Sequence, residues 1–242
     1  MKIEDLNHWW IQKEVKKELV PNSYRDFYNK IKNELNRRQI QIIVGLRRVG
    51  KSTIFYQLID HLIKNGKNPL NIIYCSFDEP ELQEKRIEDI LKDYSKITGI
   101  DYKKEKIFLF LDEVQKAKNW VSSVKLIYDN FLNIKILISG SASLNILTDA
   151  RKTLAGRAIY CELKPLNFKE FLNFKNIHIE KTRYLLYKDI LEREFDKFII
   201  RPFPELINEN DMNFIKNYIR TSVIEPIILK DMPKEFEDVD IL

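Results

Sequence analysis

The sequence predicts an α/β fold in which a mostly parallel, five-stranded sheet is followed by a small helical region. Short apolar segments rich in β-branched residues alternate with longer segments whose apolar residues recur at helical spacing. This alternation is typical of a parallel sheet covered by helices. After Pro165 the strand-like segments stop and only helical patterns follow. We therefore expect the sheet to be complete before that residue.

Five segments have the composition of buried strands. They are apolar almost throughout, as expected of strands whose two faces are both covered. In chain order they are residues 40–44, 71–77, 106–111, 134–138 and 158–163. Helical spacing is found around them, at residues 24–35, 54–63, 87–97, 120–131, 168–172, 184–199 and 214–224.

The chain length suits one medium domain with smaller attachments, since it is 242 residues. We expect an N-terminal helical arm at residues 1–38, an α/β domain at residues 39–165 and a helical C-terminal region at residues 166–242. Trp9 and Trp10 are interpreted as packing residues of the arm, where large aromatic side chains bury most surface.

The composition excludes several classes of protein. No apolar stretch is long enough to span a membrane and no signal peptide is present, so we expect a cytoplasmic protein without a membrane partner. Cys75 and Cys161 lie in apolar segments and are expected to be free thiols. Lysine and arginine number 41 against 36 acids, a mixed surface that permits a nucleic-acid partner without arguing for one.

One segment has a complete nucleotide-binding signature, G-x-x-x-x-G-K-[ST], between a predicted strand and a predicted helix. Its backbone N–H groups can surround a phosphate, and the helix N-terminus adds partial positive charge. Its lysine can reach the β- and γ-phosphates and its serine can ligate Mg²⁺, which predicts a three-layer P-loop NTPase sandwich. The predicted nucleotide-binding residues are Gly45, Leu46, Arg47, Arg48, Val49, Gly50, Lys51, Ser52 and Thr53.

Two acidic residues supply the second element that such a phosphate loop requires. Asp112 and Glu113 directly follow the apolar segment at residues 107–111. Asp112 is expected to hold Mg²⁺ through water, together with Ser52. Glu113 is expected to orient or deprotonate an attacking water. Lys51 and Glu113 are therefore the first two candidate catalytic residues.

Two further catalytic candidates have alternative interpretations. Ser139 follows the predicted strand at 134–138, where its hydroxyl could contact the γ-phosphate or the water, or could belong to a turn that caps a following helix. Arg157 could stabilise charge on the transferred phosphoryl group, from its own subunit or a neighbouring one. Alternatively, it is a surface arginine that precedes the last strand.

The ordered set of these segments resembles the prokaryotic, largely archaeal AAA-type ATPases whose phosphate loop reads G-x-R-R-x-G-K-[ST]. The resemblance covers roughly residues 39–172. Besides the phosphate loop it rests on Leu111-Asp112-Glu113-Val114-Gln115 with Trp120 behind it, Leu126-Ile127-Tyr128-Asp129, Ile138-Ser139-Gly140-Ser141, Leu154-Ala155-Gly156-Arg157, and Leu163-Lys164-Pro165-Leu166 before Phe168-Lys169-Glu170-Phe171.

The resemblance implies an AAA-like domain that binds ATP and ADP with Mg²⁺. It also implies that Ser139 or Ser141 is a sensor on the fourth strand and that Arg157 is an arginine finger. The helical region departs from the family, whose members often have a Gly-Gly-Phe-Pro-like turn where this chain has Arg201-Pro202-Phe203-Pro204-Glu205. Members usually continue into a further C-terminal domain, which we expect this chain to lack, either as a fragment or as a short member.

The first functional hypothesis is a Mg-dependent ATPase, slow or assembly-dependent, that drives or switches a partner. The alternatives are an ATP-gated regulatory module with little turnover, a nucleic-acid-dependent ATPase and a small-molecule kinase. A kinase usually has a compact arginine cluster over its acceptor site, and the helical region shows none in its sequence. A homo-oligomer and a protein or DNA partner are both left open.

Overall fold

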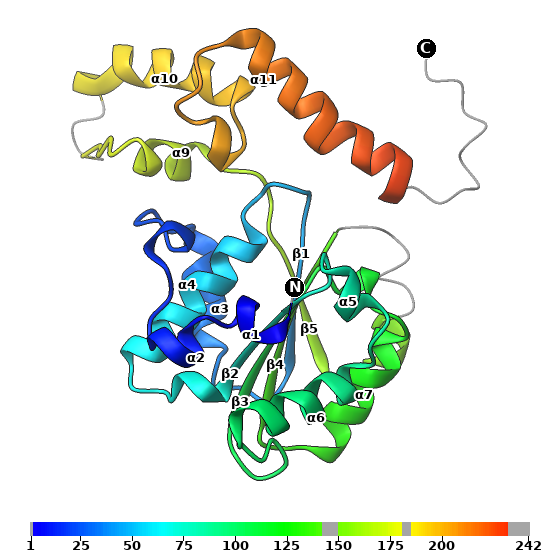
Figure 1. Ribbon diagram of the computed structural model, residues 1–242. Helices are drawn as coiled ribbons and strands as arrows, with labels where there is room; N and C mark the ends of the chain where they lie inside the picture. Colours follow the sequence, from blue (N-terminus) through cyan, green and yellow to red (C-terminus); the bar gives the residue numbers. More distant parts are fainter. Residues whose placement is uncertain (1, 142–149, 181–184, 232–242) are drawn as a thin grey trace.

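The computed structural model describes residues 2–141, 150–180 and 185–231, and within them five parallel strands form one sheet (Figure 1). The strand order is β2-β3-β4-β1-β5, and every neighbouring pair is parallel. The α/β fold class predicted from the alternating pattern is therefore confirmed. The strands are β1 Ile40–Val44, β2 Ile72–Ser76, β3 Ile107–Asp112, β4 Ile134–Gly140 and β5 Ala158–Glu162.

Helices cover both faces of the sheet and make it the middle of three layers. In Figure 1, α3 (Asp26–Asn33) and α4 (Lys51–Lys64) lie on one face, and α6 (Ile87–Thr98) and α7 (Trp120–Asn130) lie on the other, with the short α5 (Pro80–Gln83) near them. All residues of β1 and β3 are buried, which explains why these strands are apolar without alternation. Each fully buried branched side chain contributes about 1.5–3 kcal/mol relative to an exposed one.

The N-terminal arm covers the outer edge of β2. It contains α1 (Ile3–Leu6), α2 (Trp9–Gln12) and a 3₁₀ turn at Lys17–Leu19 before α3. The Asn7 side chain pairs with both backbone groups of Tyr74, at 2.7 and 2.8 Å, and the indole N–H groups of Trp9 and Trp10 both donate to Ile72 O. Backbone groups of an edge strand that would otherwise be unpaired are thereby satisfied. The interpretation of both tryptophans as packing residues is confirmed by their burial.

The helical region lies above the end of the sheet where β1 leads into the phosphate loop (Figure 1). It contains α9 (Phe168–Phe174), α10 (Lys188–Ile200), a 3₁₀ turn (Pro204–Leu206) and α11 (Met212–Tyr218). From α11 the chain continues in π-helical turns at Ile219–Ile224 and Ile227–Asp231. A small separate core holds the region together and comprises Leu166, Phe171 and Ile207 with Phe168, Phe174 and Phe198 packed against it. Within the described residues, no helix is long and apolar enough to cross a membrane.

Candidate functional site

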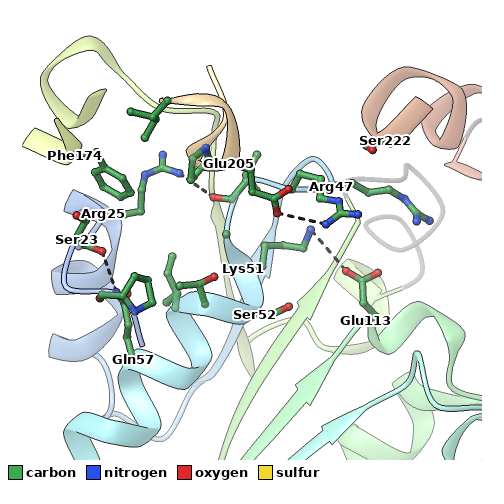
Figure 2. Close-up of a pocket in the computed structure, with 18 of the residues that line it drawn as sticks. Ser23, Arg25, Arg47, Lys51, Ser52, Gln57, Glu113, Phe174, Glu205 and Ser222 are labelled. Atoms are coloured by element: carbon green, nitrogen blue, oxygen red, sulfur yellow. Dashed lines mark hydrogen bonds and ion pairs between the residues drawn. The ribbon is translucent and has the colours of Figure 1, made fainter. Parts of the chain in front are cut away.

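The phosphate loop opens into a pocket of about 910 Å³, a size typical of small-molecule sites (Figure 2). Residues 47–53 form its floor, the arm contributes Ser23 and Arg25, and Glu113 comes from the end of β3. The helical region forms the remaining wall through Phe174, Pro204, Glu205, Ile207, Asn208, Thr221, Ser222 and Pro226. The pocket therefore lies between the sheet and the helical region.

The loop backbone adopts conformations that suit an anion. Gly50, which precedes the first residue of α4, has a φ of 97°, and Arg48 has a φ of 66°. Left-handed conformations of this kind turn successive N–H groups toward one side of the chain. The N-cap residue of α4 is Gly50, which has no side chain that could cap the helix. The first-turn amides of a helix without a cap are free to bind a phosphate.

Gly45 is required because the chain beyond β5 passes directly against it. A Cβ atom at this position would lie 2.3 Å from the carbonyl oxygen of Leu163. A hydrogen bond holds the two segments together at this point, because the Leu163 N–H donates to Val44 O at 2.8 Å. A side chain at position 45 would push apart the start of the phosphate loop and the end of β5.

We therefore expect Gly45→Ala to lower both the free energy of unfolding and the affinity for nucleotide. Overpacking of this kind costs about 1–3 kcal/mol, which urea denaturation would measure. Gly66→Ala is the control, because Gly66 has a φ of 78° and open space around its Cβ position, far from the loop in sequence. That control should lose some stability through backbone strain and keep its affinity. Equal affinities in the two variants would contradict this prediction.

Lys51 is the first residue of α4, and its side chain is almost fully buried beneath the pocket. Its ammonium donates to the carbonyl oxygens of Gly45 (3.1 Å) and Leu46 (3.0 Å) and lies 3.8 Å from a Glu113 carboxylate oxygen. Ser52 and Thr53 follow in the first turn of the helix and line the same pocket (Figure 2). Lys51 and Ser52 thus both line the same pocket in the structure.

Asp112 lies at the end of β3 and is only 2% exposed. Its Oδ2 atom accepts from the Tyr74 hydroxyl at 2.7 Å, and its Oδ1 atom accepts from the Ser139 hydroxyl and from the Glu113 N–H. Asp112 is not among the residues that line the pocket, so it lies behind the lining residue Glu113. A bridging water would have to connect it to anything bound there, as the sequence prediction supposed.

Glu113 leaves the strand with a left-handed backbone, at a φ of 51°. Such a conformation costs a non-glycine residue about 1–3 kcal/mol and is found chiefly at functional sites. It directs the side chain into the pocket toward Lys51 (Figure 2), where Gln115 Nε2 donates to Oε2 at 2.6 Å. The carboxylate is thereby oriented by one neutral donor and one cation.

The residues present fit a magnesium ion that arrives with a nucleotide. Within the described residues, no three His, Cys, Asp or Glu side chains form a metal-binding group. Magnesium is typically held by one or two protein ligands together with phosphates and water, and it prefers oxygen. The Ser52 hydroxyl and the Asp112 carboxylate supply that donor set, and Asp112 is already held in one orientation by three hydrogen bonds.

Ser139 is predicted from the sequence to follow a strand, but the structure places it within one. β4 extends through Gly140, so Ser139 lies inside it and is fully buried. Its hydroxyl donates to Asp112 and accepts from the Glu113 N–H at 3.4 Å. Ser139 itself therefore belongs to the strand and not to a turn. The capping candidates after Ser141 lie outside the described residues.

Arg157 lies at the amino-terminal ends of the strands, whereas the phosphate loop lies at their carboxyl-terminal ends. Ile40, the first residue of β1, donates its N–H to Arg157 O, whereas the loop follows Val44, the last residue. The guanidinium forms a two-point ion pair with Asp129 of α7, at 2.7 and 3.0 Å. The expectation that Arg157 could act in the pocket of its own chain is therefore wrong, because the length of β1 separates Arg157 from that pocket.

Sequence reasoning missed Arg25, which joins three parts of the site. Its guanidinium donates to Glu170 of α9 at 2.9 Å, to Val49 O of the phosphate loop at 2.9 Å and to Lys164 O at 2.8 Å. Both side chains of the Arg25–Glu170 pair are buried. No local pattern marks Arg25, because its partners are up to 145 residues away.

A second contact joins the phosphate loop to the helical region. Arg48 lies 3.4 Å from Glu205 and its guanidinium is 6.0 Å from the centre of the Tyr218 ring. The Tyr218 hydroxyl in turn donates to Glu205 at 2.5 Å. The helical wall of the pocket is therefore held to the loop by an arginine of the loop and a carboxylate of the Pro-Phe-Pro-Glu turn.

Comparison with known proteins connects this geometry to a family. A family model described as an AAA domain matches residues 37–172, which contain all five strands and the phosphate loop. Two uncharacterized proteins of Methanocaldococcus jannaschii are related. MJ1637 is 33% identical over 224 residues, covering 84% of this chain and 46% of that protein. MJ1544 is 33% identical over 195 residues, covering 80% and 42%.

An uncharacterized protein of Haemophilus influenzae is 31% identical over 196 residues, covering 80% of this chain and 46% of that protein. The chain thus spans less than half the length of these three relatives. Two solved structures align at a TM-score of 0.45. One is C. elegans PCH-2, at 12% identity, covering 76% of this chain and 51% of that one. The other is AMPPCP-bound DnaA from Aquifex aeolicus, at 16% identity, covering 88% and 62%.

Proposed function

The chain belongs to the AAA domain family, and on that premise we propose that it binds ATP with Mg²⁺ and hydrolyses it to ADP and phosphate, to drive or switch a partner. One observation carries the proposal: Lys51 and Ser52 of the phosphate loop and the acid Glu113 line a single pocket. Asp112 is fixed directly behind Glu113 by hydrogen bonds.

Each part of the pocket has a task in this reaction. The loop amides and the Lys51 ammonium bind the phosphates, which would replace the Gly45 and Leu46 carbonyls as partners of that ammonium. Ser52, and Asp112 through water, would hold magnesium, which would supply positive charge to the phosphate oxygens. Glu113 faces the same end of the pocket and accepts a proton from, or orients, the attacking water.

Movement of the helical region follows from the contacts that hold it. Arg48 pairs with Glu205 across the pocket, and both side chains are half exposed. Bound phosphates would compete with Glu205 for Arg48, whereas the buried Arg25–Glu170 pair would keep the base of the region fixed. Nucleotide occupancy can thus change the angle of the described part of the helical region, α9 to α11, relative to the sheet, which we propose as the output of the cycle.

The position of Arg157 suggests that full activity requires association of two or more copies of the chain. Because it lies opposite the pocket of its own chain, it can stabilise transferred charge only in the pocket of a second copy. A single chain would then turn over slowly. Without such an assembly the same structure would act as an ATP-gated module with little turnover.

The decisive experiment measures phosphate release and nucleotide binding with Mg²⁺, for ATP and GTP, over a wide range of protein concentration. We expect ATP to bind and to be hydrolysed, with a specific activity that rises as copies associate. Arg157→Ala should remove this rise, while Arg37→Ala, which alters an exposed arginine paired with Glu34, should not. Binding without phosphate release at any concentration would favour the gated module, and no binding would refute both functions.

A further inference from the structure

Tyr74 reaches the predicted magnesium ligand from a neighbouring strand. In the parallel pairing of β2 with β3, Ser76 is opposite Asp112 and Tyr74 is two residues earlier, on the same face of the sheet. The phenol spans that offset, and its hydroxyl donates to Asp112 Oδ2 at 2.7 Å. Both side chains are nearly inaccessible to solvent. This contact is outside the phosphate loop and is not required by any motif in the sequence.

The two carboxylate oxygens of Asp112 have different partners. Oδ1 accepts from the Ser139 hydroxyl and from the Glu113 N–H. Oδ2 has the Tyr74 hydroxyl as its partner. A carboxylate oxygen offers about two acceptor sites, so Oδ1 is already fully used and Oδ2 can still accept one metal-bound water beside the Tyr74 hydroxyl. Tyr74 therefore holds the rotation of the carboxylate about its Cβ–Cγ bond from the Oδ2 side, while Ser139 and Glu113 hold it from the Oδ1 side.

Tyr74 is itself held from several directions. Asn7 pairs with its backbone N–H and C=O, and the ring lies at an edge contact with Trp9, with centroids 6.5 Å apart. The centre of the Tyr56 ring of α4 lies 5.0 Å from the centre of the Tyr74 ring.

We propose that Tyr74 is a positioning residue for magnesium, whose hydroxyl holds Asp112 in the rotation that accepts a metal-bound water. The proposal rests on the proposed binding of ATP with Mg²⁺. Partners of metal ligands of this kind change metal affinity by about 10–100-fold when removed. Because Asp112 acts through water, the lower end of that range applies.

The test is Tyr74→Phe, studied through binding of a non-hydrolysable ATP analogue, with titrated Mg²⁺ and in EDTA. We expect the Mg²⁺ concentration for half-maximal enhancement of binding to rise about tenfold, while affinity in EDTA stays as in the wild type. Tyr94→Phe is the matched control, since Tyr94 is also buried and donates its hydroxyl to a backbone carbonyl, Leu70 O. It should match the wild type in both conditions.

An unchanged Mg²⁺ requirement in folded Tyr74→Phe would overturn the proposal, and so would an equal loss of affinity with and without Mg²⁺. If that variant does not fold, Tyr56→Phe serves instead, because it keeps Tyr74 and removes the hydroxyl of the α4 ring that packs against it. It should raise the Mg²⁺ requirement by a smaller factor, and no rise would again overturn the proposal. Failure of the wild type to bind the analogue would instead refute the proposed function.

Discussion

Replacing Lys51 by alanine is expected to remove most of the affinity of this chain for ATP. The ammonium is buried at the head of α4 and lies 3.8 Å from a Glu113 carboxylate oxygen at the floor of the pocket. Loss of one partner from a buried, charged hydrogen-bonded pair costs about 2–5 kcal/mol, which corresponds to a dissociation constant raised by at least about 30-fold. Isothermal titration with ATP and Mg²⁺ measures the change directly.

Lys64→Ala is the control for this experiment. Lys64 is the last residue of the same helix, its side chain is 72% exposed, and it pairs with Asp60 at 2.8 Å. Removing it takes one lysine from α4 without touching the pocket, so the affinity should stay within about twofold of the wild type. A thermal melt of each variant separates weaker binding from unfolding. Wild-type affinity in folded Lys51→Ala would refute the assignment of the phosphate loop.

Replacing Glu113 by glutamine is expected to separate hydrolysis from binding. The amide has the shape of the carboxylate and can retain the hydrogen bond with Gln115, but it cannot accept a proton from water. A general base contributes about 10²–10⁴-fold to a rate, so we expect a loss of that order in the single-turnover rate. Binding should be retained or strengthened, because the negative charge 3.8 Å from Lys51 is lost.

Rapid-quench measurement of phosphate formation under single-turnover conditions tests this expectation, with Glu84→Gln as the control. Glu84 is an exposed acid whose carboxylate lies 3.7 Å from Lys118, and it does not line the pocket. The control should hydrolyse ATP at the wild-type rate. A Glu113→Gln protein that forms phosphate as fast as this control would exclude Glu113 as the base.

The phosphate loop and its acids could be predicted because their signal is local. The spacing of two glycines, a lysine and a serine needs only the strand before it and the helix after it, and both are present as β1 and α4. The acids at the end of β3 were found in the same way. For Asp112 the pattern indicated its place in the chain but not its burial behind the pocket or its bond to Tyr74.

Ser139 and Arg157 show where local patterns fail. Ser139 lies near the end of β4 and Arg157 directly precedes β5. The sequence of one strand does not indicate which other strands it will pair with. The order β2-β3-β4-β1-β5 places Ser139 against Asp112 and places Arg157 at the far edge of the sheet, beside Asp129. The helical region adds Glu170 and Glu205, whose partners Arg25 and Arg48 are more than a hundred positions earlier.

The sequence by itself determined the α/β class, the five strands and the residues of the phosphate loop, since apolar periodicity and glycine spacing act between neighbours in the chain. The tertiary structure alone decided which side chains fix the carboxylate of Asp112, which wall closes the pocket and that Arg157 faces away from it. These depend on strand order and helix packing, where contacts form between residues far apart in sequence and only the folded chain brings them together.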